Sequence, residues 1–383
     1  MSGWNKVRLG EISTNIQTGP FGSQLHQSDY EKHGLPVIMP KDIVNGSILE
    51  SGIARVGELM AKKLSRHKVA LDDIVYPRRG DVAKCTIIGE KENGWLCGTG
   101  CLKVTIDKTK ALPLFVYYQL QTPSKTGWIE KHTVGATMPN LNTGIIGQVP
   151  IELPTLNLQV KIVSTLSAYD NLIDNYRRQI KLLEEAAQRL YKEWFVDFHF
   201  PGYEQTKIVD GVPEGWRKGL LGEIINIYYG KDHKKVPLVG NIPVYGSGGL
   251  MRMCNKSLYS GESVLIPRKG SLNNIMYVNC AFWTVDTMFF TSMKISHCAL
   301  FVYFFLKRFD MYGMNIGSAV PSMTTKVLNS FDILIPCDEI LCSFDNAVQP
   351  LFQNILKLQK LILLTQEARD RLLPKLMSGE IKV

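Results

Sequence analysis

Two short turns place cationic side chains beside glycine directly after an apolar run. One run ends at Pro77 and leads into Arg78, Arg79 and Gly80, and the other ends at Pro267 and leads into the segment 268–270, which reads Arg-Lys-Gly. Guanidinium and ammonium groups beside a flexible glycine can hold phosphate groups or reach the edge of guanine. We therefore interpret both turns as candidate DNA contacts. Their candidate residues are Arg78, Arg79, Lys84, Arg268, Lys269 and Asn273.

Other loops offer hydroxyl, amide and amino groups at places that recur in the two halves of the chain. The loops Gly19–Gln24 and Lys231–Lys235 follow a shared opening, and two Thr/Ser/Asn-rich segments precede the long helices described below. The candidates in these loops are Ser23, Gln24, Thr137, Asn140, Asn142, Lys231, Lys234, Lys235, Ser322, Thr324 and Lys326. A single loop of this kind is equally consistent with an ordinary solvated turn. The recurrence in both halves favours a function.

Signatures of catalysis are missing from the sequence. There is no G-x-x-x-x-G-K-[S/T] nucleotide loop, no H-E-x-x-H metal site and no G-x-S-x-G nucleophile. The seven histidines are scattered, and the eight cysteines contain no C-x-x-C pair. We expect reduced thiols, no metal, no cofactor and no enzymatic activity in this chain.

The totals fit a protein of two or three domains with real cores. The 383 residues are 45% hydrophobic and carry a formal net charge of +9, as expected of a protein that meets a polyanion. No apolar run reaches the roughly 18 residues of a membrane helix. The opening residues contain no apolar export signal, so we expect a cytoplasmic protein without membrane contact.

A strict hydrophobic repeat marks the middle of the chain. Apolar residues recur there at alternating steps of four and three, a period of 3.5 that is typical of a coiled coil. This seam consists of Ile162, Leu166, Tyr169, Ile173, Tyr176, Ile180, Leu183, Ala187, Leu190 and Trp194. At 1.5 Å per residue it is about 48 Å long and needs a partner of matching length.

The C-terminal fifty residues provide that partner. With an offset of 182 residues, the apolar positions of the two segments coincide. The second seam consists of Val348, Leu351, Ile355, Leu358, Ile362 and Leu372, with Thr365 and Arg369 as polar interruptions. We expect the two helices to pair as an antiparallel coiled coil, because a two-fold axis relating the repeats would orient them in opposite directions.

The pairing belongs to a tandem duplication of the whole chain. The opening segment 3–12 recurs at 215–224 with seven of ten residues identical, and both basic turns and both Thr/Ser/Asn-rich segments recur as well. Short β-rich runs such as Cys101–Ile106 mix with helical runs such as Leu114–Leu120, which predicts an α+β class. We predict a first domain (1–154), a long helix (155–200), a second domain (201–336) and a C-terminal long helix (337–383), with pseudo-two-fold symmetry.

The duplicated Gly-Trp-x-x-x-x-Leu-Gly-Glu-Ile opening, the Gly-Pro-Phe-Gly-Ser loop at 19–23, the Pro-Arg-Arg-Gly turn and the two helices resemble the specificity subunit of type I restriction-modification systems. The resemblance covers the whole chain and implies two target-recognition domains that each read one half of a bipartite site in double-stranded DNA. The helices would act as a fixed spacer and dock two modification subunits. It also implies that adenine methylation with S-adenosylmethionine, and cleavage with ATP and Mg by restriction subunits, reside in the partners.

The second copy departs from the Gly-Pro-Phe-Gly-Ser loop, because its segment 230–233 reads Gly-Lys-Asp-His. Two alternatives stay open. A coiled-coil scaffold that joins protein partners would share the repeat and lack catalysis, but would bind DNA without sequence preference. A single-chain nuclease or methylase would need the motifs that are missing.

Overall fold

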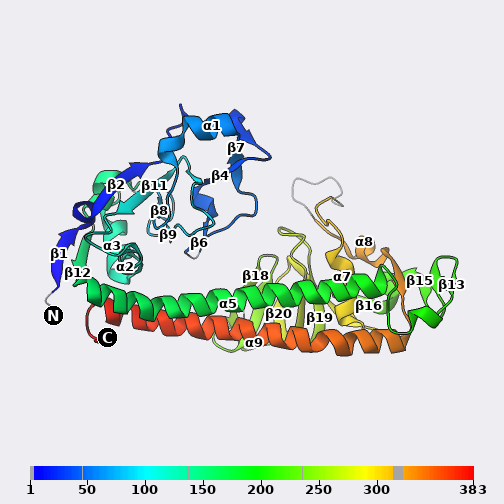
Figure 1. The fold of residues 1–383 in the computed structure, drawn as a ribbon. Helices are drawn as coiled ribbons and strands as arrows, with labels where there is room; N and C mark the ends of the chain where they lie inside the picture. The colour runs from blue at the N-terminus through cyan, green and yellow to red at the C-terminus, as the bar shows by residue number, and fades with distance from the viewer. Residues whose placement is uncertain (1–3, 45, 136–138, 235, 314–321) are drawn as a thin grey trace. The chain divides into compact units, whose positions relative to one another are not determined.

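The computed structural model describes residues 4–44, 46–135, 139–234, 236–313 and 322–383. The chain divides into two compact units, Met1–Asn175 with Leu361–Val383, and Tyr176–Lys360. Each unit therefore contains one domain of helices and sheets together with one part of each long helix (Figure 1). This confirms the predicted α+β class with two tandem domains and two long helices.

The first domain is built from two four-stranded sheets and short helices. The sheets have the strand orders β2-β11-β8-β9 and β10-β4-β7-β3, and β1-β12 and β5-β6 form separate two-stranded sheets. The strands are β1 (Asn5–Arg8), β2 (Ser13–Thr18), β3 (Tyr30–Glu31), β4 (Leu35–Ile38), β5 (Ile43–Val44), β6 (Ser47–Ile48), β7 (Ala54–Val56), β8 (Ile74–Pro77), β9 (Thr86–Ile87), β10 (Leu96–Cys97), β11 (Cys101–Ile106) and β12 (Pro150–Leu153). The helices are α1 (Glu58–Lys63), α2 (Pro113–Leu120), α3 (Pro123–His132) and α4 (Thr143–Gly147).

The second domain has one six-stranded sheet with the order β16-β21-β19-β20-β17-β18. β15 and β22 form a separate two-stranded sheet, which corresponds to β1-β12, and β13 pairs with β14. The strands are β13 (Ile208–Val209), β14 (Val212–Pro213), β15 (Arg217–Leu220), β16 (Ile225–Tyr229), β17 (Ile242–Gly246), β18 (Gly249–Cys254), β19 (Tyr259–Pro267), β20 (Met276–Thr284), β21 (Met288–Met293) and β22 (Asp332–Ile335). The helices are α6 (Leu221–Ile224), α7 (Ala299–Lys307) and α8 (Thr325–Asn329).

The duplication is visible in strand order and in register. The order β2-β11-β8-β9 corresponds to β16-β21-β19-β20. Cys101 lies opposite Pro77 in the first sheet, and Met288 lies opposite Pro267 in the second. The two domains therefore share a central sheet, although the segments inserted after β2 and β16 fold differently.

The two helices α5 (Leu156–Phe195) and α9 (Asp338–Met377) each have 40 residues, and in each unit they run antiparallel. In the first unit Asp170 on α5 forms an ion pair with Arg369 on α9, at 2.6 Å. In the second unit Phe195 packs edge to face against Phe344, with 4.8 Å between the ring centroids. Later residues of α5 thus meet earlier residues of α9, as expected of an antiparallel pair.

The predicted seam residues point inward on both helices. Those that are buried are Ile162, Leu166, Ile173, Ala187, Trp194, Val348, Ile355 and Leu358. Those that are half-buried are Tyr169, Tyr176, Ile180, Leu183, Leu190, Leu351, Ile362 and Leu372. Arg369, a polar interruption in the second seam, is accommodated because Asp170 neutralises its charge, and Tyr118 donates a 2.5 Å hydrogen bond to the same carboxylate.

Each domain has its own hydrophobic core, and the ends of the long helices complete it. Ile162 and Leu166 join the first core together with Leu376, while Tyr191 and Phe344 join the second. Tyr191 lies outside the 3.5-residue repeat, because this end of α5 packs against a whole domain as well as against one helix. Within the described part of the chain, no helix is long and apolar enough to cross a membrane.

Candidate nucleic-acid interface

The predicted loops of the first domain gather at one edge of its central sheet. Both β2 and β8 pair antiparallel with β11, so their carboxyl ends meet the start of β11 at the same edge. There the Gly19 amide donates to the Cys101 carbonyl at 2.9 Å, and the Arg78 amide donates to the Gly100 carbonyl at 2.7 Å. We call this edge, with the loop that starts at Gly19 and the turn 78–80, the turn edge of the first domain.

The second domain builds the same edge from equivalent strands. The Gly230 amide donates to the Met288 carbonyl at 2.9 Å, and the Arg268 amide donates to the Thr287 carbonyl at 2.8 Å. The loop that starts at Gly230 and the turn 268–270 form the turn edge of the second domain. The two loops that sequence comparison placed in equivalent positions therefore also have equivalent backbone anchors.

The Thr/Ser/Asn-rich segments join these edges through isolated β-bridges. Arg79 is bridged to Asn140, and Lys269 is bridged to Ser322. The neighbouring amides of Leu141 and Met323 donate to the Arg78 and Arg268 carbonyls, at 2.8 and 2.9 Å. Segments 61 residues apart in the first copy and 53 apart in the second are thus brought side by side, which places two groups of predicted residues on one surface.

Both turns are held in a fixed shape. Gly80 and Gly270 have φ values of 79° and 85°, a left-handed backbone conformation that residues with a Cβ rarely adopt. Two residues later, Val82 and Leu272 are buried. The turns are therefore anchored on both sides while Arg79 and Lys269 remain exposed.

The first cation of each turn is half-buried and is used for local contacts. Arg78 Nε lies 3.4 Å from the Leu141 carbonyl. Arg268 donates from Nη1 to the Asp286 carbonyl at 3.2 Å, and its guanidinium lies over the Tyr229 ring, 5.3 Å from the centroid. Consequently Arg79 and Lys269 have the greater freedom to reach a ligand, whereas Arg78 and Arg268 shape the turns.

Several other predicted residues are engaged within the protein. Asn142 and Thr324 cap α4 and α8, accepting hydrogen bonds from the Ile145 and Val327 amides at 2.9 and 3.3 Å. Asn273 donates to Asp310 at 3.0 Å and accepts from the Met311 amide. Other engaged groups are Lys84, which pairs with Asp81, and Gln24, which accepts from the Phe21 amide.

The remaining candidates differ in exposure and in what the structure describes. Ser23, Lys231, Lys234 and Lys326 are exposed, and Ser322 is half-exposed. Asn140 keeps a buried Oδ1 that has no hydrogen-bond partner among the described residues, next to the bridge with Arg79. Thr137 and Lys235 lie outside the described residues.

Two aromatic residues of the second turn edge were not predicted from sequence. Tyr229 is 52% exposed and lies below Arg268, and the Tyr312 hydroxyl donates to the Gly270 carbonyl at 3.0 Å. The position of Tyr229, directly before the loop at Gly230, was a usable signal. Tyr312 had none, because its place depends on how the chain returns from α7.

The groups around the first turn edge are suited to binding a ligand rather than to reacting with one. Burial raises the pKa of Cys97 to about 12 and the pKa of Cys101 well above its usual range, so neither thiol is a nucleophile at neutral pH. Among the residues that the structure describes, no group of three or more His, Cys, Asp or Glu could hold a metal ion. Exposed cations, hydroxyls and amides at a rigid edge are suited to contacts with phosphates and base edges.

Comparison with known proteins identifies a consistent set of relatives. Residues 1–185 and 213–372 match the family model described as the type I restriction modification DNA specificity domain. The chain is 27% identical over 387 residues to the type I restriction enzyme MjaIX specificity subunit of Methanocaldococcus jannaschii, covering 93% of this chain and 88% of that protein.

A second relative and a solved structure extend the match to nearly the full length. The HindI specificity subunit of Haemophilus influenzae is 22% identical over 472 residues, covering all of both chains. The crystal structure of a type I restriction-modification S subunit from M. genitalium superimposes with a TM-score of 0.57 at 19% identity, covering 98% of this chain and 96% of that one. The present chain therefore has the same fold as that S subunit.

Proposed function

The chain belongs to the type I restriction-modification DNA specificity family, and from this membership we propose that its two domains each read one half of a bipartite DNA site. The observation that carries the proposal is the pair of turn edges. The same three segments meet at the same sheet edge in both domains, and in both an exposed cation is bridged to a residue with a hydrogen-bonding side chain.

The two edges carry different side chains on equivalent backbones. Arg79 and Asn140 in the first domain correspond to Lys269 and Ser322 in the second. Arginine and lysine both favour guanine, arginine through a planar bidentate contact and lysine as a compact point charge, whereas asparagine suits adenine and serine suits several bases, so the two edges differ in what they can read. A shared scaffold with distinct reading groups is what two unequal half-sites require.

We assign the helices α5 and α9 to spacing and to docking of modification subunits. Their seam is occupied by the intramolecular pair, so partner contacts would use the outer faces. Exposed leucines lie there at Leu172 and Leu182 on α5 and at Leu356, Leu361, Leu363 and Leu364 on α9. Exposed apolar side chains of this number favour a protein partner over permanent contact with water.

In this proposal the chain is non-catalytic, and the chemistry belongs to its partners. Two modification subunits would bind S-adenosylmethionine and methylate adenine, and restriction subunits would use ATP and Mg for cleavage. The residues at the turn edges would select the DNA sequence and orient the complex on it.

The test uses the chain assembled with its modification subunit. Arg79→Ala and Lys269→Ala should each weaken binding to the cognate site by about 1–3 kcal/mol if the side chain reads a base, and each should relax specificity in one half-site only. A phosphate contact would instead weaken binding to all sequences and flatten the salt dependence. Lys108→Ala is the control, because this exposed lysine follows the opposite end of β11 and pairs with Asp72.

The same measurements separate the alternative function. If the chain is a coiled-coil scaffold that binds DNA non-specifically, the assembled complex will not discriminate between sequences, and neither variant will relax any base preference. Methylation of DNA by the purified chain without partners would contradict the assignment of catalysis to other subunits.

A further inference from the structure

A buried histidine and an exposed arginine lie next to the first turn edge, outside all of the predicted loops. They belong to the 3-10 helix η4 (Ser65–His67), in the segment inserted between β2 and β8. His67 is only 3% exposed, whereas Arg66 is exposed. Burial of an imidazole requires hydrogen bonds to both of its nitrogens, and these bonds define what the pair does.

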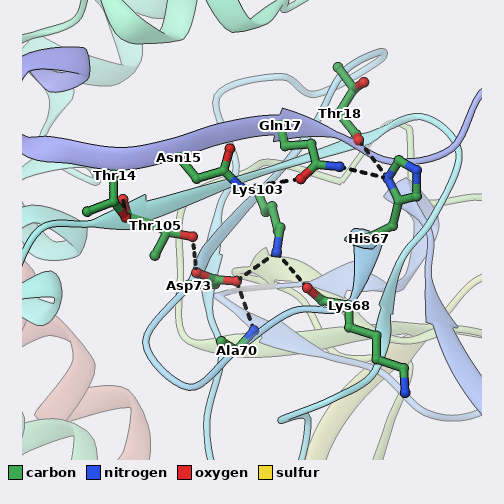
Figure 2. Close-up of polar contacts among 10 residues, drawn as sticks. All are labelled: Thr14, Asn15, Gln17, Thr18, His67, Lys68, Ala70, Asp73, Lys103 and Thr105. Carbon is green, nitrogen blue, oxygen red and sulfur yellow. Dashed lines mark hydrogen bonds and ion pairs between the residues drawn. The ribbon is translucent and has the colours of Figure 1, made fainter. Parts of the chain in front are cut away.

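The histidine connects the arginine to the end of β2. His67 Nδ1 lies 3.0 Å from the carbonyl oxygen of Thr18 (Figure 2), and Arg66 Nε donates to His67 Nε2 at 3.0 Å. Thr18 is the last residue of β2 and directly precedes Gly19, where the turn edge begins. The guanidinium of Arg66 is therefore held one imidazole ring away from this edge.

These two bonds determine the tautomer of His67. Arg66 Nε can only donate, so His67 Nε2 must carry the lone pair and Nδ1 must carry the proton. The Nδ1 proton is then donated to the Thr18 carbonyl, which at 3.0 Å is nearer to Nδ1 than the Gln17 amide nitrogen at 3.3 Å. The pKa of His67 is lowered mainly by burial and further by the nearby charges of Arg66 and Lys103. The ring therefore stays neutral, and Nε2 stays available as the acceptor for Arg66.

A second set of contacts fixes the segment that carries this pair. Lys103 on β11 donates to the Lys68 carbonyl at 2.5 Å and pairs with the buried carboxylate of Asp73 at 3.5 Å (Figure 2). Asp73 also accepts from the Ala70 amide and from the Thr105 hydroxyl, at 2.8 and 2.5 Å. The segment 66–73 is thereby attached to both β2 and β11, the two strands that meet at the turn edge.

The remaining groups of Arg66 are available for a ligand. Within the described residues, no carboxylate lies within ion-pair distance of Arg66, and its only hydrogen bond uses Nε. On the preceding helix α1, Lys63 is exposed and adds positive charge to this surface, while Lys62, also exposed, pairs with Glu58 at 2.7 Å.

The second domain contains an arginine–histidine pair that serves as a contrast. Arg252 Nε donates to His233 at 3.2 Å, but its other nitrogens donate to the carbonyls of His233, Val236 and Pro237. All three side-chain nitrogens of Arg252 therefore donate to the loop 233–237, whereas only Nε of Arg66 donates to another described residue.

We propose that Arg66 contacts a DNA phosphate beside the half-site read by the first domain, and that His67 positions it. The inference rests on the proposed function, since it assumes that the turn edge faces DNA. Two unengaged guanidinium nitrogens in a fixed orientation match the two oxygens of a phosphate. Arg66 would set the register of the first domain on the duplex without reading a base.

The experiment measures DNA affinity of the complex with its modification subunit over a range of salt concentrations. Arg66→Gln should weaken binding about tenfold on cognate and non-cognate DNA alike, and the slope of log K against log salt should become shallower by about one. Lys108→Gln, the exposed control at the opposite end of β11, should change neither quantity.

The positioning role of His67 has its own readout. His67→Leu removes the acceptor and should give the same shallower salt slope as Arg66→Gln, although Arg66 is still present. His67→Gln, whose Oε1 can accept from Arg66, should restore most of the slope of the unmodified complex. Thermal denaturation of each variant shows whether it folds. If His67→Leu does not fold, Arg66→Gln and His67→Gln still decide the proposal.

The possible outcomes are distinguishable. Loss of preference at one base pair with Arg66→Gln would overturn the phosphate assignment. An unchanged affinity and slope for Arg66→Gln, while Arg79→Ala still weakens binding, would overturn the proposal and leave the proposed function intact. No effect from Arg66, Arg79 or Lys269 variants would contradict the proposed function itself.

Discussion

Adding one methyl group to Gly19 should displace the loop at the first turn edge. A Cβ at this position would lie 2.0 Å from the carbonyl oxygen of Gly98 and 2.8 Å from that of Cys97. Gly230 is in the same situation in the second domain, where the Cβ would lie 2.0 Å from the Val285 carbonyl. Both obstacles are backbone atoms, which no rotamer change can remove.

The size of the effect follows from these distances. Real Cβ contacts are essentially never shorter than 3.0 Å, so the backbone of Gly19→Ala must move by about 1 Å. The Gly19 amide is 2.9 Å from the Cys101 carbonyl, and a shift of that size in the wrong direction breaks the bond. Overpacking costs about 1–3 kcal/mol and the lost hydrogen bond about 1 kcal/mol, so we expect a loss of about 2–4 kcal/mol in the free energy of unfolding.

Two measurements and two controls test this expectation. Urea denaturation gives the stability, and mapping of methylated adenines by the assembled complex gives the recognised sequence. Gly22→Ala and Gly248→Ala are matched controls, because nothing lies within 4 Å of either Cβ. Gly19→Ala should impair recognition of one half-site and Gly230→Ala the other. If both are as stable and as specific as their controls, the close approaches at the turn edges are not as described.

Three further perturbations address the helices and the buried polar groups. Phe344→Ala removes a ring that is fully buried among Tyr191 and Trp194, so urea denaturation should show a loss of about 3–5 kcal/mol. Ile180→Asp places an unpaired charge in the seam, at a cost of several kcal/mol, and should abolish co-purification with the modification subunit; normal assembly would mean that the seam faces solvent. The lowered pKa of His67 means that the unfolded chain binds a proton more readily than the folded chain, so stability should fall as pH drops below about 6.5, and His67→Gln should reduce this loss.

The long helices were predictable because one simple pattern determines them. The predicted spans 155–200 and 337–383 contain the observed helices Leu156–Phe195 and Asp338–Met377. The same pattern missed Tyr191, which is buried by α7 and α9 of the second unit. A 3.5-residue repeat describes contact with one helix, and residues that also pack on a domain lie outside it.

The turn edges were predictable only in part. The repeated sequences identified the turns and the loops, but not that Asn140 and Ser322 would be bridged to Arg79 and Lys269, since such pairing depends on sheet register over about sixty residues. Asn142 and Thr324 were predicted as DNA contacts, and the structure uses both as helix caps. Their types and positions before short helices were a signal for that role.

Arg66 was missed because no local pattern marks it. An exposed arginine beside a histidine is common, and its position becomes informative only when the fold places His67 against Thr18. The buried pair of Lys103 and Asp73 was missed for the same reason: its residues lie thirty apart and meet only through the pairing of β8 with β11.

The most direct test of two independent reading domains is a domain exchange. Residues 1–150 are replaced by the equivalent domain of a relative, and methylated adenines are mapped genome-wide in cells that contain the chimera and the modification subunit. We predict that one half of the recognised sequence changes, while the other half and the spacer length stay the same. A change in both halves at once would contradict the account.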